Sequence, residues 1–129
     1  MDSSYLLSMV YGYLFSITVE TLVLLPGLSR PHRVATRFFA GIWLTACTYP
    51  LLWLVLPYFV SAENRPRFLT VGETLVPLAE CGLFYVAFQY GRGLTRGQRW
   101  RDWIAIVLAN LASFGLGEVV YRFWPEFPL

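Results

Sequence analysis

Four long apolar stretches, separated by short polar segments, make up almost the whole chain. They run from Tyr5 to Leu25, from Phe38 to Val60, from Phe68 to Tyr90 and from Trp103 to Trp124. Each holds about twenty residues, the length that a helix rising ~1.5 Å per residue needs to cross the hydrocarbon of a bilayer. Because lipid cannot hydrogen-bond an open backbone, each stretch is predicted to be a helix. The pattern predicts an all-α integral membrane protein, a single domain over residues 1–129, whose four transmembrane helices form an antiparallel bundle.

The first stretch is predicted to be a retained span rather than a signal peptide. No basic residue precedes it, and it reaches Pro26 without a small-residue cleavage pattern. A signal peptide normally has both a basic start and such a cleavage site. The chain is therefore expected to keep all four spans.

The arginines predict the orientation of the bundle. Short cytoplasmic loops are enriched in basic residues, and here seven arginines lie in the first and third connections against two in the second. The first and third loops are therefore predicted to be cytoplasmic, and both termini to face the outer side of the cell membrane, taken to be a bacterial inner membrane. The arginines are Arg30, Arg33 and Arg37 in the first loop, Arg65 and Arg67 in the second, and Arg92, Arg96, Arg99 and Arg101 in the third.

The composition argues against several classes of protein. Of the 129 residues, 57% are hydrophobic and 14% are charged, whereas soluble proteins average ~25% charged residues. The net charge of +2 is too small to indicate a nucleic-acid partner. No hydrolase, zinc-protease or phosphate-loop motif occurs, so an enzyme is not expected. The single histidine, His32, is predicted to be a solvated loop residue. The sequence contains no haem or covalent cofactor motif, and no metal site is expected. Whether the protein binds any other cofactor stays unknown.

Carboxylates inside the spans are the feature that points to a function. Glu20, Glu73 and Glu80 lie within apolar stretches and have no basic residue beside them. A charged side chain at the bilayer centre costs roughly 2.5–3.5 kcal/mol on insertion scales, so such residues are rare and usually functional. Each must be protonated, hydrogen-bonded, or neutralised by a group from outside the spans. That group could be a proton in transit, a metal ion or an arginine of a neighbouring subunit.

Neutral polar residues of other spans can join these glutamates. Glu73 and Glu80 are seven residues apart and so share one helix face, while Thr48 and Asn110 occupy the second and fourth spans. Together with Glu20, they are predicted to form a polar pathway for a proton or another cation. Near the outer end of the fourth span, Glu118 precedes a basic residue by four positions, and Glu118 with Arg122 is predicted to be an interfacial ion pair.

Small side chains are predicted to mediate close packing between the helices. Such residues let helix backbones approach in a membrane, and they recur every four positions along the first span. Cys47 and Cys81 are expected to be buried thiols, with a disulfide possible only if their helices pack at matching depth. The predicted packing residues are Ser8, Gly12, Ser16 and Gly117.

Two main hypotheses for the function remain open. The first is a small proton- or cation-handling membrane protein, either a channel or a coupled transporter. The second is a non-catalytic structural subunit or assembly factor of a larger membrane complex, with a lipophile-binding protein as a third possibility. The expected partners are the lipid bilayer and either further copies of the chain or other subunits of a membrane complex.

Overall fold

The structure, a computed structural model, describes residues 3–61 and 63–126. Two of its helices continue beyond their α-helical part in wider or tighter turns. Each of the four, with these turns, is long and apolar enough to cross a membrane, and the described residues contain no strand. The predicted four-helix membrane fold is confirmed. The helices are α1 (Ser3–Gly27), α2 (Val34–Pro50, continued by a π-helical turn, Leu51–Val55, and a 3-10 turn, Leu56–Tyr58), α3 (Arg65–Phe84, continued by a π-helical turn, Tyr85–Gln89) and α4 (Arg96–Phe123).

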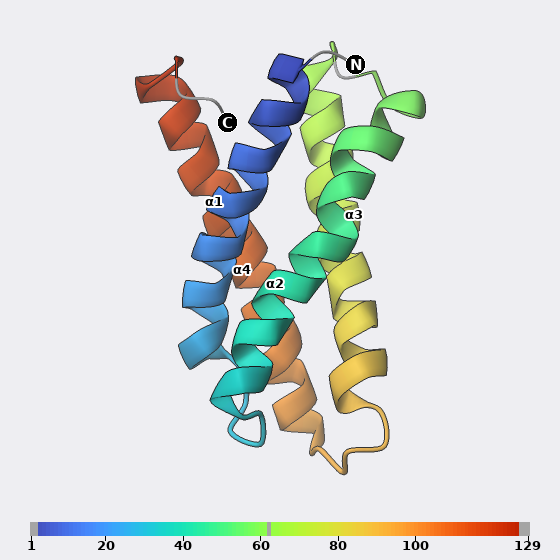
Figure 1. The fold of residues 1–129 in the computed structure, drawn as a ribbon. Coiled ribbons are helices and arrows are strands. Elements are labelled where there is room, and N and C mark those ends of the chain that lie inside the picture. The colour runs from blue at the N-terminus through green and yellow to red at the C-terminus, as the bar shows by residue number, and fades with distance from the viewer. Residues whose placement is uncertain (1–2, 62, 127–129) are drawn as a thin grey trace.

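The helices run up and down in chain order, as Figure 1 shows. The start of α1, the end of α4 and the connection between α2 and α3 lie at one end of the bundle, which we call the terminal end. The connections of residues 28–33 and 90–95 lie at the other end, which we call the loop end. Consecutive helices are therefore antiparallel, as the short connections require.

Helix α4 begins well before Trp103, where the apolar stretch begins. The reason is a capping box, in which the Thr95 hydroxyl accepts a hydrogen bond from the Gln98 amide (3.1 Å) and the Gln98 side chain accepts one from the Thr95 amide (2.9 Å). These bonds satisfy backbone donors that have no partner within the helix. The first turns of α4 are thus helical although they are polar, and they precede the apolar part of the helix.

The buried apolar side chains gather in the half of the bundle nearest the loop end. The outward surface, in contrast, carries large apolar side chains: Leu22, Leu78 and Val86 are 64%, 65% and 73% exposed. Such a surface suits lipid rather than water. The core consists of Leu24, Leu28, Ala40, Leu44, Phe84, Ala105, Ile106 and Ala109.

Helix α1 makes the most extensive contacts, packing against both α2 and α4. Two glycines allow the close approach to α2. A Cβ atom on Gly41 would lie 2.2 Å from the Thr21 hydroxyl oxygen and 3.1 Å from the Thr21 Cα, and one on Gly12 would lie 2.0 Å from the Tyr49 hydroxyl oxygen. A larger residue at Gly41 would therefore push the backbones of the two helices apart.

Candidate functional site

A cavity of about 340 Å³ occupies the half of the bundle nearest the terminal end. Residues from all four helices line it, including Glu20, Glu73, Glu80 and Glu118, while Arg65 is its basic residue. At the terminal end, the side chains of Arg65 and Glu118 are each 40% exposed. In the middle of the bundle, Glu20 and Glu80 are only 5% and 3% exposed. The cavity therefore leads from an accessible mouth to two deeply buried carboxyl groups.

Each of these buried carboxyl groups contacts a threonine hydroxyl of α2. The Thr45 hydroxyl oxygen lies 2.5 Å from a carboxyl oxygen of Glu20, and the Thr48 hydroxyl oxygen lies 2.8 Å from one of Glu80. The second carboxyl oxygen of Glu80 accepts a hydrogen bond of 2.7 Å from the side-chain amide of Asn110. The structure thus brings together Glu80, Thr48 and Asn110 of the predicted pathway. Sequence reasoning missed Thr45.

The hydrogen atoms available at these contacts cannot serve both the ionised carboxyl groups and the helix carbonyls at the same time. Thr45 and Thr48 also lie 3.0 Å and 2.9 Å from the carbonyl oxygens of Gly41 and Leu44, which can only accept. A hydroxyl has a single hydrogen. When the hydroxyl donates to the carbonyl, the facing carboxyl oxygen must supply the other hydrogen and is protonated. When the carboxyl group is ionised, the hydroxyl turns toward it and the carbonyl loses this bond.

Asn110 fits either protonation state of Glu80. Its side-chain amide carries two hydrogens. One is donated to Glu80 and the other, over 2.9 Å, to the carbonyl oxygen of Ile106. The amide therefore holds Glu80 in place whether or not the carboxyl group carries a proton.

Glu73 lies between the buried pair and the mouth of the cavity. It is about 10 Å from Glu80 along α3, since the two are seven residues apart at ~1.5 Å per residue. It is partly buried, and its side chain makes no hydrogen bond among the described residues. The structure thus places all three predicted span glutamates on one cavity, at different depths.

The predicted partner of Glu118 is wrong. Glu118 forms its ion pair with Arg65 at the start of α3, while Arg122 makes no ion pair within the described parts of the chain. The Arg65 guanidinium also lies 4.4 Å from the centroid of the Tyr121 ring. Glu118 and Tyr121 are neighbours on one face of α4, and both contact Arg65 of α3. Contact between helices therefore decides the pairing.

The predicted packing residues lie along the wall of the same cavity. Gly12, Ser16 and Gly117 line it. Ser16 and Ser113 join α1 to α4 by a hydroxyl–hydroxyl hydrogen bond of 3.1 Å, and a Cβ atom on Gly117 would lie 3.9 Å from Phe15. Ser8 is partly buried.

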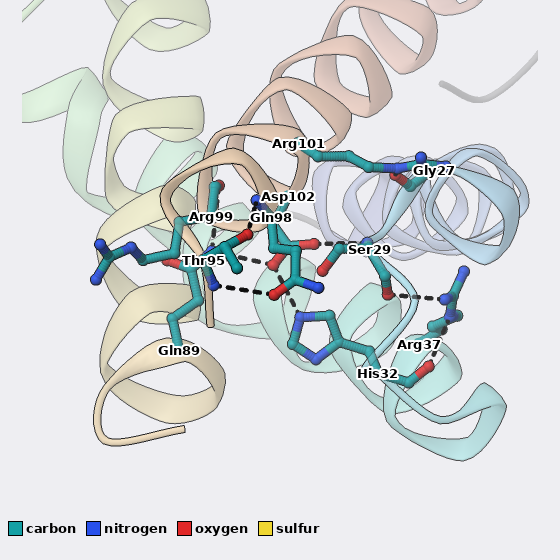
Figure 2. Close-up of polar contacts among 10 residues, drawn as sticks. All are labelled: Gly27, Ser29, His32, Arg37, Gln89, Thr95, Gln98, Arg99, Arg101 and Asp102. Atoms are coloured by element: carbon teal, nitrogen blue, oxygen red, sulfur yellow. Dashed lines mark hydrogen bonds and ion pairs between the residues drawn. The ribbon is translucent and has the colours of Figure 1, made fainter. Parts of the chain in front are cut away.

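At the loop end, Asp102 is the centre of a second polar cluster (Figure 2). This carboxylate is fully buried. It accepts hydrogen bonds from the Ser29 amide (2.7 Å) and the Gln89 side chain (3.1 Å), and it contacts the His32 ring nitrogen at 2.8 Å. The cluster joins the first loop to the ends of α3 and α4.

The prediction that His32 is solvated is wrong. Its side chain is 7% exposed and forms an ion pair or hydrogen bond with Asp102. The loop folds back over the bundle because the Arg37 guanidinium binds the carbonyl groups of Leu25, Ser29 and His32. One signal in the sequence could have indicated this contact. Asp102 directly precedes an apolar stretch, and His32, the only histidine, lies in a loop predicted on the same side of the membrane.

The two ends of the bundle differ in how they are closed: polar contacts tie the loop end together, whereas the cavity opens at the terminal end. Arg101 of α4 donates to the carbonyl group of Gly27 over 3.2 Å (Figure 2). It also donates to that of Pro26 over 3.4 Å, which adds a further tie across the loop end. Between these ties and the cavity lies the apolar core. The cavity is thus accessible from the terminal end and separated from the loop end by packed side chains.

The structure groups no three His, Cys, Asp or Glu residues for a metal ion within the residues that it describes. Cys47 and Cys81 are both free thiols. The arrangement can bind and release protons at carboxyl groups, and it can attract a cation into an acidic cavity.

No protein-family model, curated protein or solved structure matches this chain. Its function is therefore inferred from its own residues and their geometry.

Proposed function

We propose that the protein is a proton-exchanging transporter of the bacterial inner membrane. Glu20 and Glu80 take up and release protons at the inner end of the cavity, and the protein moves protons, or a cation in exchange for them, across the bilayer. Glu73 carries the proton or cation between this buried pair and the mouth of the cavity.

The observation that carries the proposal is the hydrogen count at Thr45 and Thr48. Each hydroxyl lies within hydrogen-bond distance of both a backbone carbonyl and a carboxyl oxygen. When a proton leaves one of these carboxyl groups, rotation of the hydroxyl hydrogen thus lets the hydroxyl donate to the resulting carboxylate without moving a helix. This hydrogen bond offsets part of the cost of ionising a buried carboxyl group.

The difference between the two ends of the bundle favours a coupled transporter over an open channel. A continuous pore would need a polar path through the layer of Leu44, Phe84 and Ile106, which are at most 1% exposed. With the arginine-rich loops in the cytoplasm, the cavity faces the outer side. Transport then requires the Asp102 cluster and this apolar layer to part while the mouth closes, as in alternating access.

Proton movement into proteoliposomes tests the proposal. Vesicles containing the purified protein and the pH dye pyranine are given a membrane potential with potassium and valinomycin, with and without a sodium gradient. A pH change driven by the potential alone indicates uncoupled proton flow, and one that needs sodium indicates exchange.

Glu80→Gln and Glu20→Gln are expected to reduce the pH change to that of protein-free vesicles. Glutamine keeps the size of the side chain but cannot exchange a proton. Glu63→Gln is the matched control, because Glu63 is an exposed glutamate of the α2–α3 connection. Parental rates in both buried-site variants would refute the proposal.

A subunit role in a larger membrane complex is the second candidate. It is favoured by Glu73, which makes no hydrogen bond among the described residues and could meet a basic residue of a neighbour. Purification in a mild detergent separates the two. A chain that elutes alone, or only with copies of itself, and still exchanges protons excludes the subunit role.

A further inference from the structure

A second hollow lies on the outside of the bundle, where α3 and α4 meet at the loop end. It has a volume of about 700 Å³. Gly82, in its floor, has no neighbour within 4 Å of the position of a Cβ atom, and Trp100 is 52% exposed. The hollow, which we call the α3–α4 groove, is therefore open toward lipid. Its lining residues are Cys81, Gly82, Tyr85, Arg96, Arg99, Trp100 and Trp103.

The charge of the α3–α4 groove is positive and is not balanced by nearby acids. Arg96 and Arg99 line it, and no acidic residue does. Neither guanidinium makes an ion pair within the described residues. Asp102, the nearest acid in sequence, is fully buried and is bound to the cluster at the first loop. The groove thus offers two guanidinium groups to an anion, and arginine favours phosphate because it can donate two parallel hydrogen bonds.

The groove is graded from charged to aromatic to apolar along α4. Arg96 and Trp103 are seven residues apart, which corresponds to about 10 Å at ~1.5 Å per residue. One headgroup region of a bilayer is roughly 5–8 Å thick. If the arginines lie at the level of the lipid phosphates, Trp103 therefore reaches the upper part of the acyl chains. Tyr85 and Trp100 then occupy the interface that such residues prefer.

The Trp103 ring adds apolar surface to the inner part of the groove. Its indole N–H is not part of this surface, because that nitrogen is buried inside the protein, where it has no hydrogen-bond partner among the described residues. Trp103 therefore offers an acyl chain an apolar contact.

We propose that the α3–α4 groove binds an anionic phospholipid. The phosphate lies between Arg96 and Arg99, and an acyl chain covers Trp103 and Gly82. Two arginines without acidic neighbours favour a lipid with a net negative charge over a zwitterionic one. This site is separate from the glutamate cavity and does not depend on the proposed transport.

Thermal unfolding of the delipidated full-length protein in a neutral detergent tests this site. A ligand that binds only the folded protein raises the unfolding temperature with its concentration. Phosphatidylglycerol is expected to raise it, while equal concentrations of phosphatidylcholine or inorganic phosphate have little effect. Apparent dissociation constants come from the dependence on lipid concentration.

Variants then locate the binding. Arg96→Gln and Arg99→Gln are each expected to weaken phosphatidylglycerol binding about fivefold, the factor for one basic side chain at an anionic membrane surface. Trp100→Ala, which removes an exposed aromatic ring of the groove, is expected to weaken it as well. Arg92→Gln is the matched control, since Arg92 is an exposed arginine of the same end that does not line the groove.

The proposal is overturned if the Arg96 and Arg99 variants bind phosphatidylglycerol as tightly as the parent, or if Arg92→Gln weakens binding equally. Equal stabilisation by phosphatidylcholine would show that charge plays no part. Stabilisation by inorganic phosphate alone would show that the arginines bind a free anion and that the groove holds no lipid. Should one arginine variant fail to fold, the other and Trp100→Ala decide the question.

Discussion

Replacing Asp102 with alanine removes an acceptor that three buried groups share. The Ser29 amide, the His32 ring and the Gln89 side chain all bind this carboxylate. Ser29 is 1% exposed and the His32 side chain is 7% exposed, so water cannot readily replace the lost acceptor. The Gln89 side chain keeps its second bond, to the carbonyl of Arg99 over 3.3 Å.

The expected loss in the free energy of unfolding follows from these contacts. A buried donor left without an acceptor costs about 1–3 kcal/mol. The Ser29 amide and the His32 ring each incur such a cost, and Gln89 incurs less. We therefore expect the free energy of unfolding to fall by about 3–5 kcal/mol, the range found when one partner of a buried pair is removed. This is a large part of a typical folding stability of ~5–15 kcal/mol.

Unfolding by SDS in mixed micelles, followed by helical circular dichroism, measures this loss. Asp102→Asn should lose only about 1–2 kcal/mol, because one carbonyl oxygen still accepts from Ser29 while the new amide faces the Gln89 donor. Glu63→Ala, on the exposed α2–α3 connection, should change stability by no more than about 0.5 kcal/mol. An alanine variant at Asp102 as stable as the parent would refute the idea that this cluster holds the loop end together.

Three further pairs of substitutions test other contacts. Gly41→Ala would place a Cβ atom 2.2 Å from a hydroxyl oxygen of α1 and should lower the free energy of unfolding by about 1–3 kcal/mol. Its control is Gly115→Ala, where a Cβ atom would have no neighbour within 4 Å. In the same unfolding assay, this control should be neutral or slightly stabilising. Thr48→Val should slow proton exchange in proteoliposomes while Thr48→Ser retains it; equal rates would exclude a role for the hydroxyl. Arg65→Gln should lower the free energy of unfolding by at most about 1 kcal/mol, because both side chains of its ion pair are 40% exposed. Arg122→Gln should cause no measurable loss. A larger loss in Arg122→Gln than in Arg65→Gln would contradict the observed partner of Glu118.

The fold was predictable because the apolar stretches leave little choice. A bilayer requires continuous hydrogen-bonded helices, and the short connections require antiparallel neighbours. The boundaries were less predictable. The start of α4 is set by Thr95 and Gln98 outside the apolar stretch, so hydrophobicity alone placed it too late.

The candidate site was predictable in its residues but not in its pairings. Glu20, Glu73 and Glu80 are conspicuous because each is an acid in an apolar span. Their contacts depend on how each helix is rotated about its axis, which the sequence does not specify. Thr45 and Arg65 were therefore missed as partners.

The Asp102 cluster was missed for a related reason. Asp102 and Ser29 are 73 positions apart, and each lies beside a loop, where polar residues are ordinarily solvated. Only the return of the first loop over the bundle makes Asp102 and His32 neighbours. Such long-range contacts leave no periodic pattern in the sequence.

The packing of Leu24, Leu44 and Phe84 at one end of the bundle has a consequence for its rigidity. Backbone amides in that half should exchange with deuterium slowly, because opening a helix there would separate a close-packed core. The π-helical turn at Leu51–Val55 has no fully buried residue, and π-helical turns are often found where helices change shape. We therefore expect the amides beyond this turn of α2 to exchange sooner than those of the opposite half.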